Sequence, residues 1–360
     1  MNFSNYYGRL FDRIYVTSDV TEHPATIRAT ERLKSLPLHV IGTKKDIPSE
    51  HRNSRSLFVT SPVGNTVDRC PGTRGHLCCN YLTIDLYIGC GIGCSYCILQ
   101  DYLNFSPITV YVDTRPVIER VKRLARINSD GVIRIGTGEV GDSLLYDPLF
   151  EISGELVKSF SGLDNVYFEL KTKTDFVDHL LDINNKGNAV IGFSLNPQGV
   201  VTGEEGTAAL IERRLEAAER AVEAGYLVSF HFDPIFRYDE WQREYFDLID
   251  SIEERYRIPQ DKIAWISMGT FRYTPELKDK AEERKIFLEE FVPSRDRKFR
   301  YIQKVRSRIY SSIRQRIEEH YPDVPIYMCM ESDTLWNNVF GNNPYEIPKL
   351  SDIFKPVRGL

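Results

Sequence analysis

Three cysteines, Cys90, Cys94 and Cys97, form the residue pattern with the clearest chemical meaning, because they have the spacing C-x3-C-x2-C. Thiolates this close together can hold three irons of a [4Fe–4S] cube and leave the fourth iron without a protein ligand. Glycines within and before the motif let the loop wrap tightly, since glycine adopts positive φ at little cost. An open iron can chelate a small molecule, so the motif predicts a chemically active cluster.

Two other interpretations of the motif remain open. A structural zinc site usually takes four ligands from pairs of C-x2-C, and the motif contains one such pair. A ferredoxin-like electron carrier normally has a fourth cysteine in or near the run, and Cys78 or Cys79 could fill that place. A noncatalytic iron–sulfur carrier or a zinc-binding module is therefore an alternative to an enzyme with an active cluster.

Six of the seven cysteines fall between residues 70 and 97, a clustering that indicates metal or cluster chemistry in a reducing cytosol. Cys70, Cys78 and Cys79, together with His76, could form a second metal site, a group of substrate-facing thiols or a structural element. Cys329 stands alone near the far end and is interpreted as a small buried hydrophobe.

Strands and helices alternate from Tyr81 onward, as a parallel sheet with external helices requires. A curved partial barrel and an open doubly wound sheet both satisfy this pattern, and both gather ligands at the carboxyl ends of their strands. Before this region, a short strand is predicted at Arg13–Val16 and a helix at Ala25–Leu33. The predicted core strands are Leu82–Ile88, Gly131–Ile135, Val166–Leu170, Ala189–Ser194, Leu227–Phe232 and Ile263–Met268, and the helices are Pro116–Arg126, Pro148–Ser159, Phe176–Ile183, Ala208–Ala224 and Glu240–Glu254.

The cysteine motif, with an aromatic residue before its last cysteine, resembles that of the radical S-adenosylmethionine (SAM) superfamily. Within that superfamily the chain is most similar to the spore photoproduct lyase-like branch, over about residues 10 to 330. The residues that carry the resemblance are Cys94-Ser-Tyr-Cys-Ile-Leu-Gln100, Val177-Asp-His-Leu-Leu-Asp182, Phe193-Ser-Leu-Asn196 and Asp233-Pro-Ile-Phe236 with Trp241.

The resemblance implies an α/β fold, a partial (β/α)6 TIM-type barrel that forms the radical SAM core at residues 81–290. A small N-terminal α/β cap with a cysteine-containing loop would occupy 1–80, and a basic helix with a helical and strand extension 291–360. It also implies a lyase-like mechanism. SAM chelates the open iron, the reduced cluster passes one electron to the sulfonium, and a 5′-deoxyadenosyl radical abstracts hydrogen from a substrate. A reductant such as flavodoxin or ferredoxin would supply the electron.

Further site residues are implied by the same resemblance. The segment Gly136-Thr-Gly-Glu139 is similar to the element that binds the SAM amino group, which makes Gly136, Gly138 and Glu139 cofactor-binding candidates. Lys173 and Ser194 are similar to family positions that contact SAM. The alternatives are a strand-end glycine turn for the first group, and a solvated lysine and a strand-end hydroxyl for the other two.

The chain departs from the lyase at two positions. Spore photoproduct lyase has a hydrogen-donating cysteine where a gapless alignment puts Glu139, and a tyrosine where this chain has Ile98. Tyr96 remains, so Tyr96 and Glu139 are the catalytic candidates. These departures favour a relative with a different substrate. The alternative is spore photoproduct lyase proper, a DNA repair enzyme for the thymine photoproduct, in which one of the extra cysteines serves as the hydrogen donor.

Composition limits the possible partners. The net charge of −5 excludes a uniformly basic nucleic-acid coat. Residues 295–316, however, hold nine Lys and Arg and one acidic residue, with Arg300, Lys304 and Arg308 predicted to point outward. This segment makes nucleic acid a candidate partner, although a solvated helix face is the equal alternative. The sequence has no run of 18 apolar residues and no secretory signal, so we expect a cytoplasmic protein without membrane contact.

Overall fold

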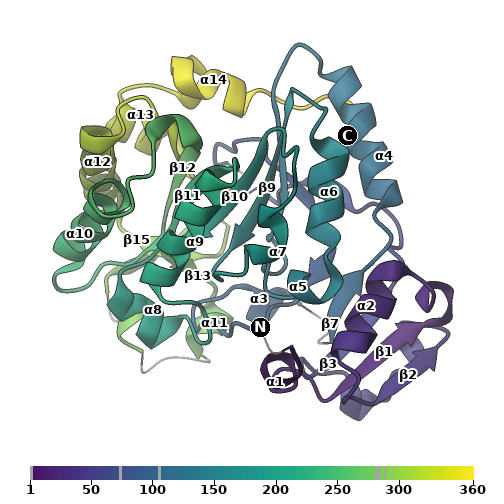
Figure 1. Cartoon of the computed structure of the whole chain (residues 1–360). Helices are drawn as coiled ribbons and strands as arrows, with labels where there is room; N and C mark the ends of the chain where they lie inside the picture. The colour runs from purple at the N-terminus through teal and green to yellow at the C-terminus, as the bar shows by residue number, and fades with distance from the viewer. Residues whose placement is uncertain (1–2, 73–74, 104–106, 280–283, 288, 295) are drawn as a thin grey trace.

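The computed structural model describes residues 3–72, 75–103, 107–279, 284–287, 289–294 and 296–360. Its centre is an eight-stranded sheet in the order β16-β12-β11-β10-β9-β8-β5-β4, in which all neighbours are parallel except the edge pair β4–β5. Figure 1 shows this sheet curling around one side of the molecule with helices outside it. Its strands are β4 (Val67–Arg69), β5 (Leu82–Ile84), β8 (Ile133–Thr137), β9 (Val166–Thr172), β10 (Ala189–Ser194), β11 (Leu227–Ile235), β12 (Ile263–Thr270) and β16 (Ile326–Met328).

Helices connect successive parallel strands, and their apolar stripes pack on the sheet. In α9, for example, Ile211, Leu215 and Ala218 are buried, whereas Leu210, which the predicted helix Ala208–Ala224 included, precedes α9 and is exposed. The main connecting helices are α4 (Arg115–Ile127), α6 (Ile152–Phe160), α7 (Asp178–Leu181), α9 (Ile211–Glu223), α10 (Trp241–Glu254) and α12 (Gln303–His320).

A second, five-stranded sheet lies at the N-terminal side of the molecule (Figure 1). Three of its strands precede residue 80, but the other two, β6 and β7, come from later in the chain and tie this sheet to the central one. The division of the chain at residues 80 and 290 stays a prediction. The sheet consists of β2 (Leu38–Ile41), β1 (Arg13–Thr17), β3 (Ser56–Thr60), β7 (Ile108–Tyr111) and β6 (Tyr87–Ile88), with α1 (Phe3–Tyr7) and α2 (Pro24–Arg32) beside it.

Each of the six predicted core strands contributes a strand to the central sheet, but two predicted elements are wrong in detail. The run 82–88 is not one strand, because β5 and β6 belong to different sheets. The predicted helix 148–159 is broken at Glu151, which adopts φ +55 and separates α5 (Asp147–Phe150) from α6. The Glu151 carboxylate lies 2.5 Å from Arg32 Nη2. This ion pair with α2 stabilises the interruption between α5 and α6.

The C-terminal part of the chain returns to the central sheet. After α12, strand β16 pairs with β12 and adds a parallel strand that the sequence analysis did not include. The final residues then cross to the far edge, where the Asn128 side-chain amide donates to the Arg358 carbonyl (3.0 Å) beside α4. The remaining elements are α3 (Leu99–Tyr102), α8 (Gln198–Glu204), α11 (Pro275–Asp279), α13 (Asp333–Phe340), α14 (Pro348–Phe354) and the small sheet of β13 (Arg272–Tyr273), β14 (Phe291–Pro293) and β15 (Phe299–Tyr301).

Within the described ranges, no helix combines the length and the apolar character that crossing a membrane requires.

Candidate active site

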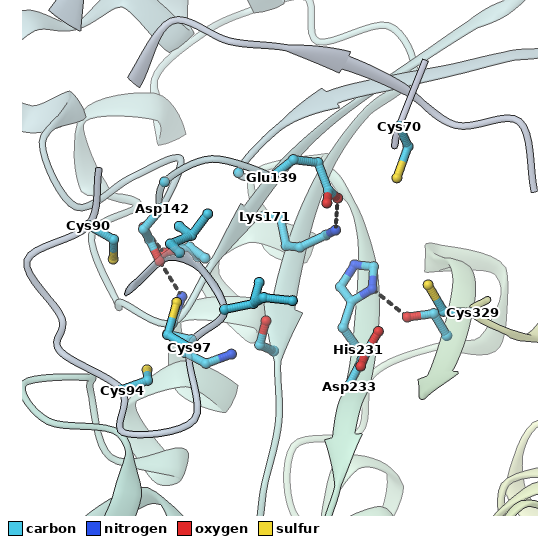
Figure 2. A pocket seen from close by; sticks show the side chains of 18 of the residues that line it. Cys70, Cys90, Cys94, Cys97, Glu139, Asp142, Lys171, His231, Asp233 and Cys329 are labelled. Atoms are coloured by element: carbon cyan, nitrogen blue, oxygen red, sulfur yellow. Dashed lines mark hydrogen bonds and ion pairs between the residues drawn. The ribbon is translucent and has the colours of Figure 1, made fainter. Parts of the chain in front are cut away.

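A cavity of about 270 Å³ opens at the carboxyl ends of the central strands. Register explains the convergence, because Ser194 pairs with His231 and His231 with Ser267, which brings these strand ends to one edge. Figure 2 shows that side chains from the cysteine loop, from β9 and from β11 point into this space. The charged and thiol-bearing lining residues are Cys70, Cys79, Cys90, Cys94, Cys97, Glu139, Asp142, Glu169, Lys171, Lys173, His231, Asp233, Arg272 and Cys329.

The loop that carries Cys90, Cys94 and Cys97 follows β6 and borders the cavity. The turn is compact, with the Cys97 amide donating to the Cys94 carbonyl (3.2 Å) and Gly93 at φ +77. Burial raises the pKa of the Cys94 thiol to about 12. A metal must therefore displace the proton to obtain a thiolate ligand, and metal binding is expected to release protons.

The side chains present fit the iron–sulfur group that the motif predicts. Three thiols from one loop line one cavity, and thiolates are the ligands that such clusters take. Among the described residues, no three His, Cys, Asp or Glu side chains are arranged around a single metal ion. Neither the loop nor the group of Cys70, His76, Cys78 and Cys79 is thus formed as a single-ion site in this structure.

A buried ionic network contacts the cysteine loop through Tyr96. The Tyr96 hydroxyl donates to the Glu205 carboxylate, which forms an ion pair with Arg214 at 2.5 Å. Lys173 Nζ lies 3.9 Å from Glu205, at the cavity side. Burial alone would raise the pKa of Glu205, but Lys173 and Arg214 hold it down at about 2. Tyr96, predicted as catalytic, is therefore a buried member of this network, and it also lines the cavity.

The segment Gly136–Glu139 lies at the end of β8, as predicted. Gly136 is required by close packing, because a Cβ there would approach the Tyr81 hydroxyl to 2.1 Å. Gly138 adopts φ +101, which favours glycine. The turn directs the Glu139 carboxylate into the cavity, where it pairs with Lys171 Nζ at 2.7 Å (Figure 2). Glu139 is thus placed to accept a hydrogen bond from a cation in the cavity.

Asp142 organises the strand ends around this turn, and the sequence analysis did not identify it. Its carboxylate is buried and accepts from the backbone amides of Leu144, Leu145 and Lys173 and from the Thr172 hydroxyl, at 2.7–3.0 Å. These bonds fix the backbone of Lys173 next to the cysteine loop. No local motif identified this aspartate, because two of its donors lie about 30 positions later in the chain.

Glu169 is the second residue that the sequence analysis missed. It lies inside β9 and is buried, and its carboxylate accepts from the Tyr81 hydroxyl (2.7 Å) and lies 2.7 Å from His231 Nε2. His231 Nδ1 in turn lies 2.6 Å from the Ser267 hydroxyl. Burial would raise the pKa of Glu169, but His231 and its other partners lower it. His231 belongs to this network and also lines the cavity.

The remaining cofactor candidates lie at the same cavity. Lys173 and Ser194 both line it from the ends of neighbouring strands. Within the described residues no hydrogen bond joins the two side chains. Ser194 is held in place because its carbonyl accepts from Arg214 Nη1 at 2.7 Å. Their predicted contacts with SAM stay a prediction.

Cys329 does not behave as the isolated buried hydrophobe that the sequence suggested. It follows β16 and lines the cavity together with Cys70 and Cys79. The prediction failed because β16 brings the end of the chain to the same sheet edge as the cysteine loop, which no local pattern indicates.

Within the described residues 296–316, four of the basic side chains form ion pairs inside the protein: Arg300, Arg306, Arg314 and Arg316. Arg300 is 2% exposed and pairs with Asp296 at 2.5 Å, so its predicted outward position is wrong. Arg306 and Arg316 pair with Glu331 and Asp250. Lys304 and Arg308 are exposed, as predicted. Glu331 and Asp250 lie outside the segment, so counting charges along it could not reveal these two pairs.

The open parallel sheet, with three cysteines of one loop at the carboxyl edge, defines the radical SAM class of enzymes. The family model described as "Spore photoproduct lyase" matches residues 78–329, well over half of the chain. The chain therefore belongs to the spore photoproduct lyase family of radical SAM enzymes.

Curated relatives and solved structures agree with this assignment. The spore photoproduct lyase of Bacillus subtilis is 27% identical over 69% of this chain and 74% of its own length, and that of a Geobacillus strain is 29% identical over 47% of this chain and 50% of its own. A mutant spore photoproduct lyase with bound AdoMet and dinucleoside spore photoproduct superimposes with a TM-score of 0.74 at 21% identity, covering 88% of this chain and 98% of that one. The predicted partial-barrel fold is confirmed.

Proposed function

We propose that this protein cleaves SAM reductively at an iron–sulfur cluster held by Cys90, Cys94 and Cys97, and that it acts on a nucleic-acid substrate. When bound, the cluster and SAM would supply a 5′-deoxyadenosyl radical that abstracts hydrogen. The observation that carries the proposal is the convergence of the three loop thiols with Glu139, Lys173 and Ser194 on one cavity.

The protein's own residues have distinct tasks in this proposal. Glu139 would accept hydrogen bonds from the SAM amino group, and Lys173 would pair with the SAM carboxylate, since these charges are complementary. Ser194 would add a neutral hydrogen bond at the neighbouring strand end. The buried pair of Glu205 and Arg214 keeps Lys173 and the loop in fixed positions, which orients a bound cofactor.

A nucleic-acid substrate is supported by two observations. Relatives with the same fold have been solved with a dinucleoside spore photoproduct bound. In this chain, the exposed Lys304 and Arg308 on α12 offer cationic groups for a phosphate backbone. The departures at Glu139 and Ile98 favour a lesion other than the thymine photoproduct, because a carboxylate does not donate a hydrogen atom as a thiol does.

Repair of the thymine photoproduct itself is the second candidate. It is favoured by one specific observation, which is that Cys70, Cys79 and Cys329 line the cavity, with Cys70 and Cys329 across from the cysteine loop in Figure 2. In that case a thiol other than the one at the family position would donate hydrogen.

The test is an anaerobic assay of the reconstituted protein with dithionite and SAM. We expect 5′-deoxyadenosine to form, and an intact cluster without this product would favour a noncatalytic electron carrier. Adding DNA and RNA that carry defined lesions then identifies the substrate. Release of thymine from the dinucleotide photoproduct would select the second candidate over the first.

A further inference from the structure

We propose that Asp233 and Arg272 form a recognition pair on the wall of the cavity across from the cysteine loop. The pair would bind the cyclic-amide edge of one nucleobase of the substrate, in which a ring N–H lies beside a carbonyl group. Neither the family model nor the descriptions of the relatives assign a role to these two residues. The inference deepens the proposed function and rests on its nucleic-acid substrate.

The two side chains reach the cavity from neighbouring strands. Asp233 lies near the end of β11, and Arg272 lies in β13, the short strand that follows β12. Because β11 and β12 are parallel neighbours, the chain leaves both strands at the same edge of the central sheet. The Asp233 carboxylate packs against β12 at Gly269, where a Cβ would collide with it. Both side chains line the cavity, and Figure 2 shows Asp233 on the side of Cys329, across from the cysteine loop.

The ion pair between these residues leaves most of its hydrogen-bonding groups unused. Arg272 Nη1 donates to Asp233 Oδ1 at 3.4 Å, and the Asp233 carboxylate accepts no other hydrogen bond from the described residues. Arg272 Nη2 makes one weak contact, with the Met330 sulfur at 4.0 Å. A carboxylate has about four acceptor sites and a guanidinium has five N–H donors. Both groups can therefore bind a ligand and keep their mutual contact.

A second arginine in the same small sheet provides a comparison. Arg300 in β15 is the register partner of Arg272, and its guanidinium donates twice to the Asp296 carboxylate, at 2.5 and 2.8 Å. The Arg300 side chain is 2% exposed, whereas the side chains of Arg272 and Asp233 are 17% and 24% exposed. The pair at the cavity is therefore the open one of the two, as ligand binding requires.

The other carboxylates that line the cavity have partners or another task. Asp142 accepts four hydrogen bonds from the strand ends, and Glu169 contacts Tyr81 and His231. Glu139 keeps one open side, which the proposed function assigns to the SAM amino group. Among the described lining residues, Asp233 is thus the open carboxylate that is left for the substrate.

The charges of the cavity favour a neutral ligand over a phosphate. The described lining residues include four carboxylates and three Lys and Arg side chains, namely Glu139, Asp142, Glu169, Asp233, Lys171, Lys173 and Arg272. A phosphate on Arg272 would lie against the Asp233 carboxylate and would be repelled by it. A pair that is neutral as a whole binds best to a neutral group with a donor beside an acceptor.

A cyclic amide has this arrangement of donor and acceptor. Its ring N–H would donate to the Asp233 carboxylate, and its carbonyl oxygen would accept from Arg272, as guanine O6 commonly accepts from arginine. Thymine, uracil and guanine carry a ring N–H beside a carbonyl group, whereas neutral adenine and cytosine do not. The pair therefore predicts a preference among bases.

The first experiment changes the base and uses the wild-type protein. Anaerobic, cluster-loaded protein with SAM and no reductant is titrated with a fluorescein-labelled eight-nucleotide oligodeoxyadenylate, in which one central residue carries thymine, N3-methylthymine or no base. Because the methyl group replaces the ring N–H, we expect the thymine strand to bind about 10-fold more tightly than the N3-methylthymine strand. Guanine and N1-methylguanine form a second comparison. Equal affinities within both comparisons would overturn the proposal.

Variants then assign the preference to the pair. Asp233→Asn keeps the size of the side chain and removes its charge, and Arg272→Met removes the donors. Each should reduce the preference for thymine over N3-methylthymine to less than about 2-fold. Asp130→Asn is the matched control, because Asp130 forms an exposed ion pair with Arg358 outside the cavity, and it should keep the preference. If Arg272→Met does not fold, Asp233→Asn decides, and an unchanged preference in that folded variant contradicts the proposal.

The readout separates this inference from the proposed function, because it measures affinity and not turnover. Equal binding of all strands, including the strand without the central base, would refute the recognition pair and leave a nucleic-acid substrate standing. No binding of any strand would refute the nucleic-acid substrate and the pair together. A preference for thymine or guanine that depends on Asp233, in a protein that forms no 5′-deoxyadenosine, would support the pair without the radical chemistry.

Discussion

Two groups of thiols line the cavity, and they differ in how the chain assembles them. Cys90, Cys94 and Cys97 lie on one loop, whereas Cys70 and Cys79 lie on the connection between β4 and β5, and Cys329 follows β16. Burial keeps the loop thiols protonated until a metal displaces the proton. The Cys79 carbonyl accepts from Nη2 of the buried Arg134 at 3.4 Å, and the neighbouring Cys78 thiol and the Arg134 charge lower the pKa of the Cys79 thiol. The groups that neighbour a thiol therefore differ from one side of the cavity to the other.

The largest expected effect separates the two thiol groups by their need for a cluster. Cys97→Ala should abolish the charge-transfer absorption of the iron–sulfur cluster and SAM cleavage, because three thiolates are the minimum set for the cube. Cys78→Ala, outside the loop and the cavity lining, is the matched control and should retain both properties. Visible spectra and 5′-deoxyadenosine yield check this. Retained cleavage in Cys97→Ala would refute the motif assignment.

The next effect concerns the ionic network that supports the cysteine loop. Glu205→Gln leaves the fully buried Arg214 without its counter-ion, and breaking such a pair costs about 3–5 kcal/mol of unfolding free energy. Glu318→Gln, which removes the surface pair with Arg314 on α12, should cost less than about 1 kcal/mol. Urea unfolding monitored by circular dichroism measures both. Equal losses would mean that the network does not stabilise the loop.

The lowered pKa of Glu205 predicts that the stability of the protein depends on pH. The pKa of Glu205 is about 2 in the folded protein, below the value of about 4.3 in an unfolded chain. Its contribution is therefore fully present above about pH 5 and declines as the pH falls toward 2. The difference in unfolding free energy between the wild type and Glu205→Gln should shrink over that range. A difference that stays constant from pH 6 to pH 3 would contradict the lowered pKa.

A smaller effect is expected at Glu139, which lines the same cavity as both groups of thiols. Glu139→Gln should weaken SAM binding by about 10-fold, because one charge-assisted hydrogen bond becomes neutral. Glu155→Gln changes an exposed carboxylate that accepts from Thr114 outside the cavity, and should leave SAM affinity unchanged. Anaerobic isothermal titration checks both. An unchanged affinity in Glu139→Gln would limit Glu139 to its ion pair with Lys171.

The smallest effect lies outside the cavity. Replacing Lys304 and Arg308 together by glutamine should weaken binding to DNA by a few-fold and reduce the salt dependence, since about two phosphate contacts are lost. Arg123→Gln on α4 removes an exposed charge elsewhere and serves as the control. Fluorescence anisotropy at several salt concentrations measures the change. Equal effects of the two changes would exclude α12 as a nucleic-acid surface.

Local patterns predicted the elements that repeat along the chain. Strand β10 occurs at Ala189–Ser194 as predicted, and α4, α9 and α10 lie within a few residues of their predicted bounds. The run 82–88 failed, because its regular alternation of aliphatic residues with Thr83, Asp85 and Tyr87 contains no sign that the chain changes sheets between β5 and β6. Similarly, Glu169 and Asp142 were missed because their partners are distant in the chain.

The sequence by itself determined the cysteine loop, the alternating strands and helices, and the family, because these depend on spacing and periodicity within short segments. Only the tertiary structure decided that Cys329 joins the cavity, that Arg300 is buried against Asp296 and that Arg134 faces Cys79. The physical reason is that solvation and charge act through space. Burial and the nearest ion set the protonation of a thiol or the exposure of an arginine, and neighbours in space are chosen by the fold.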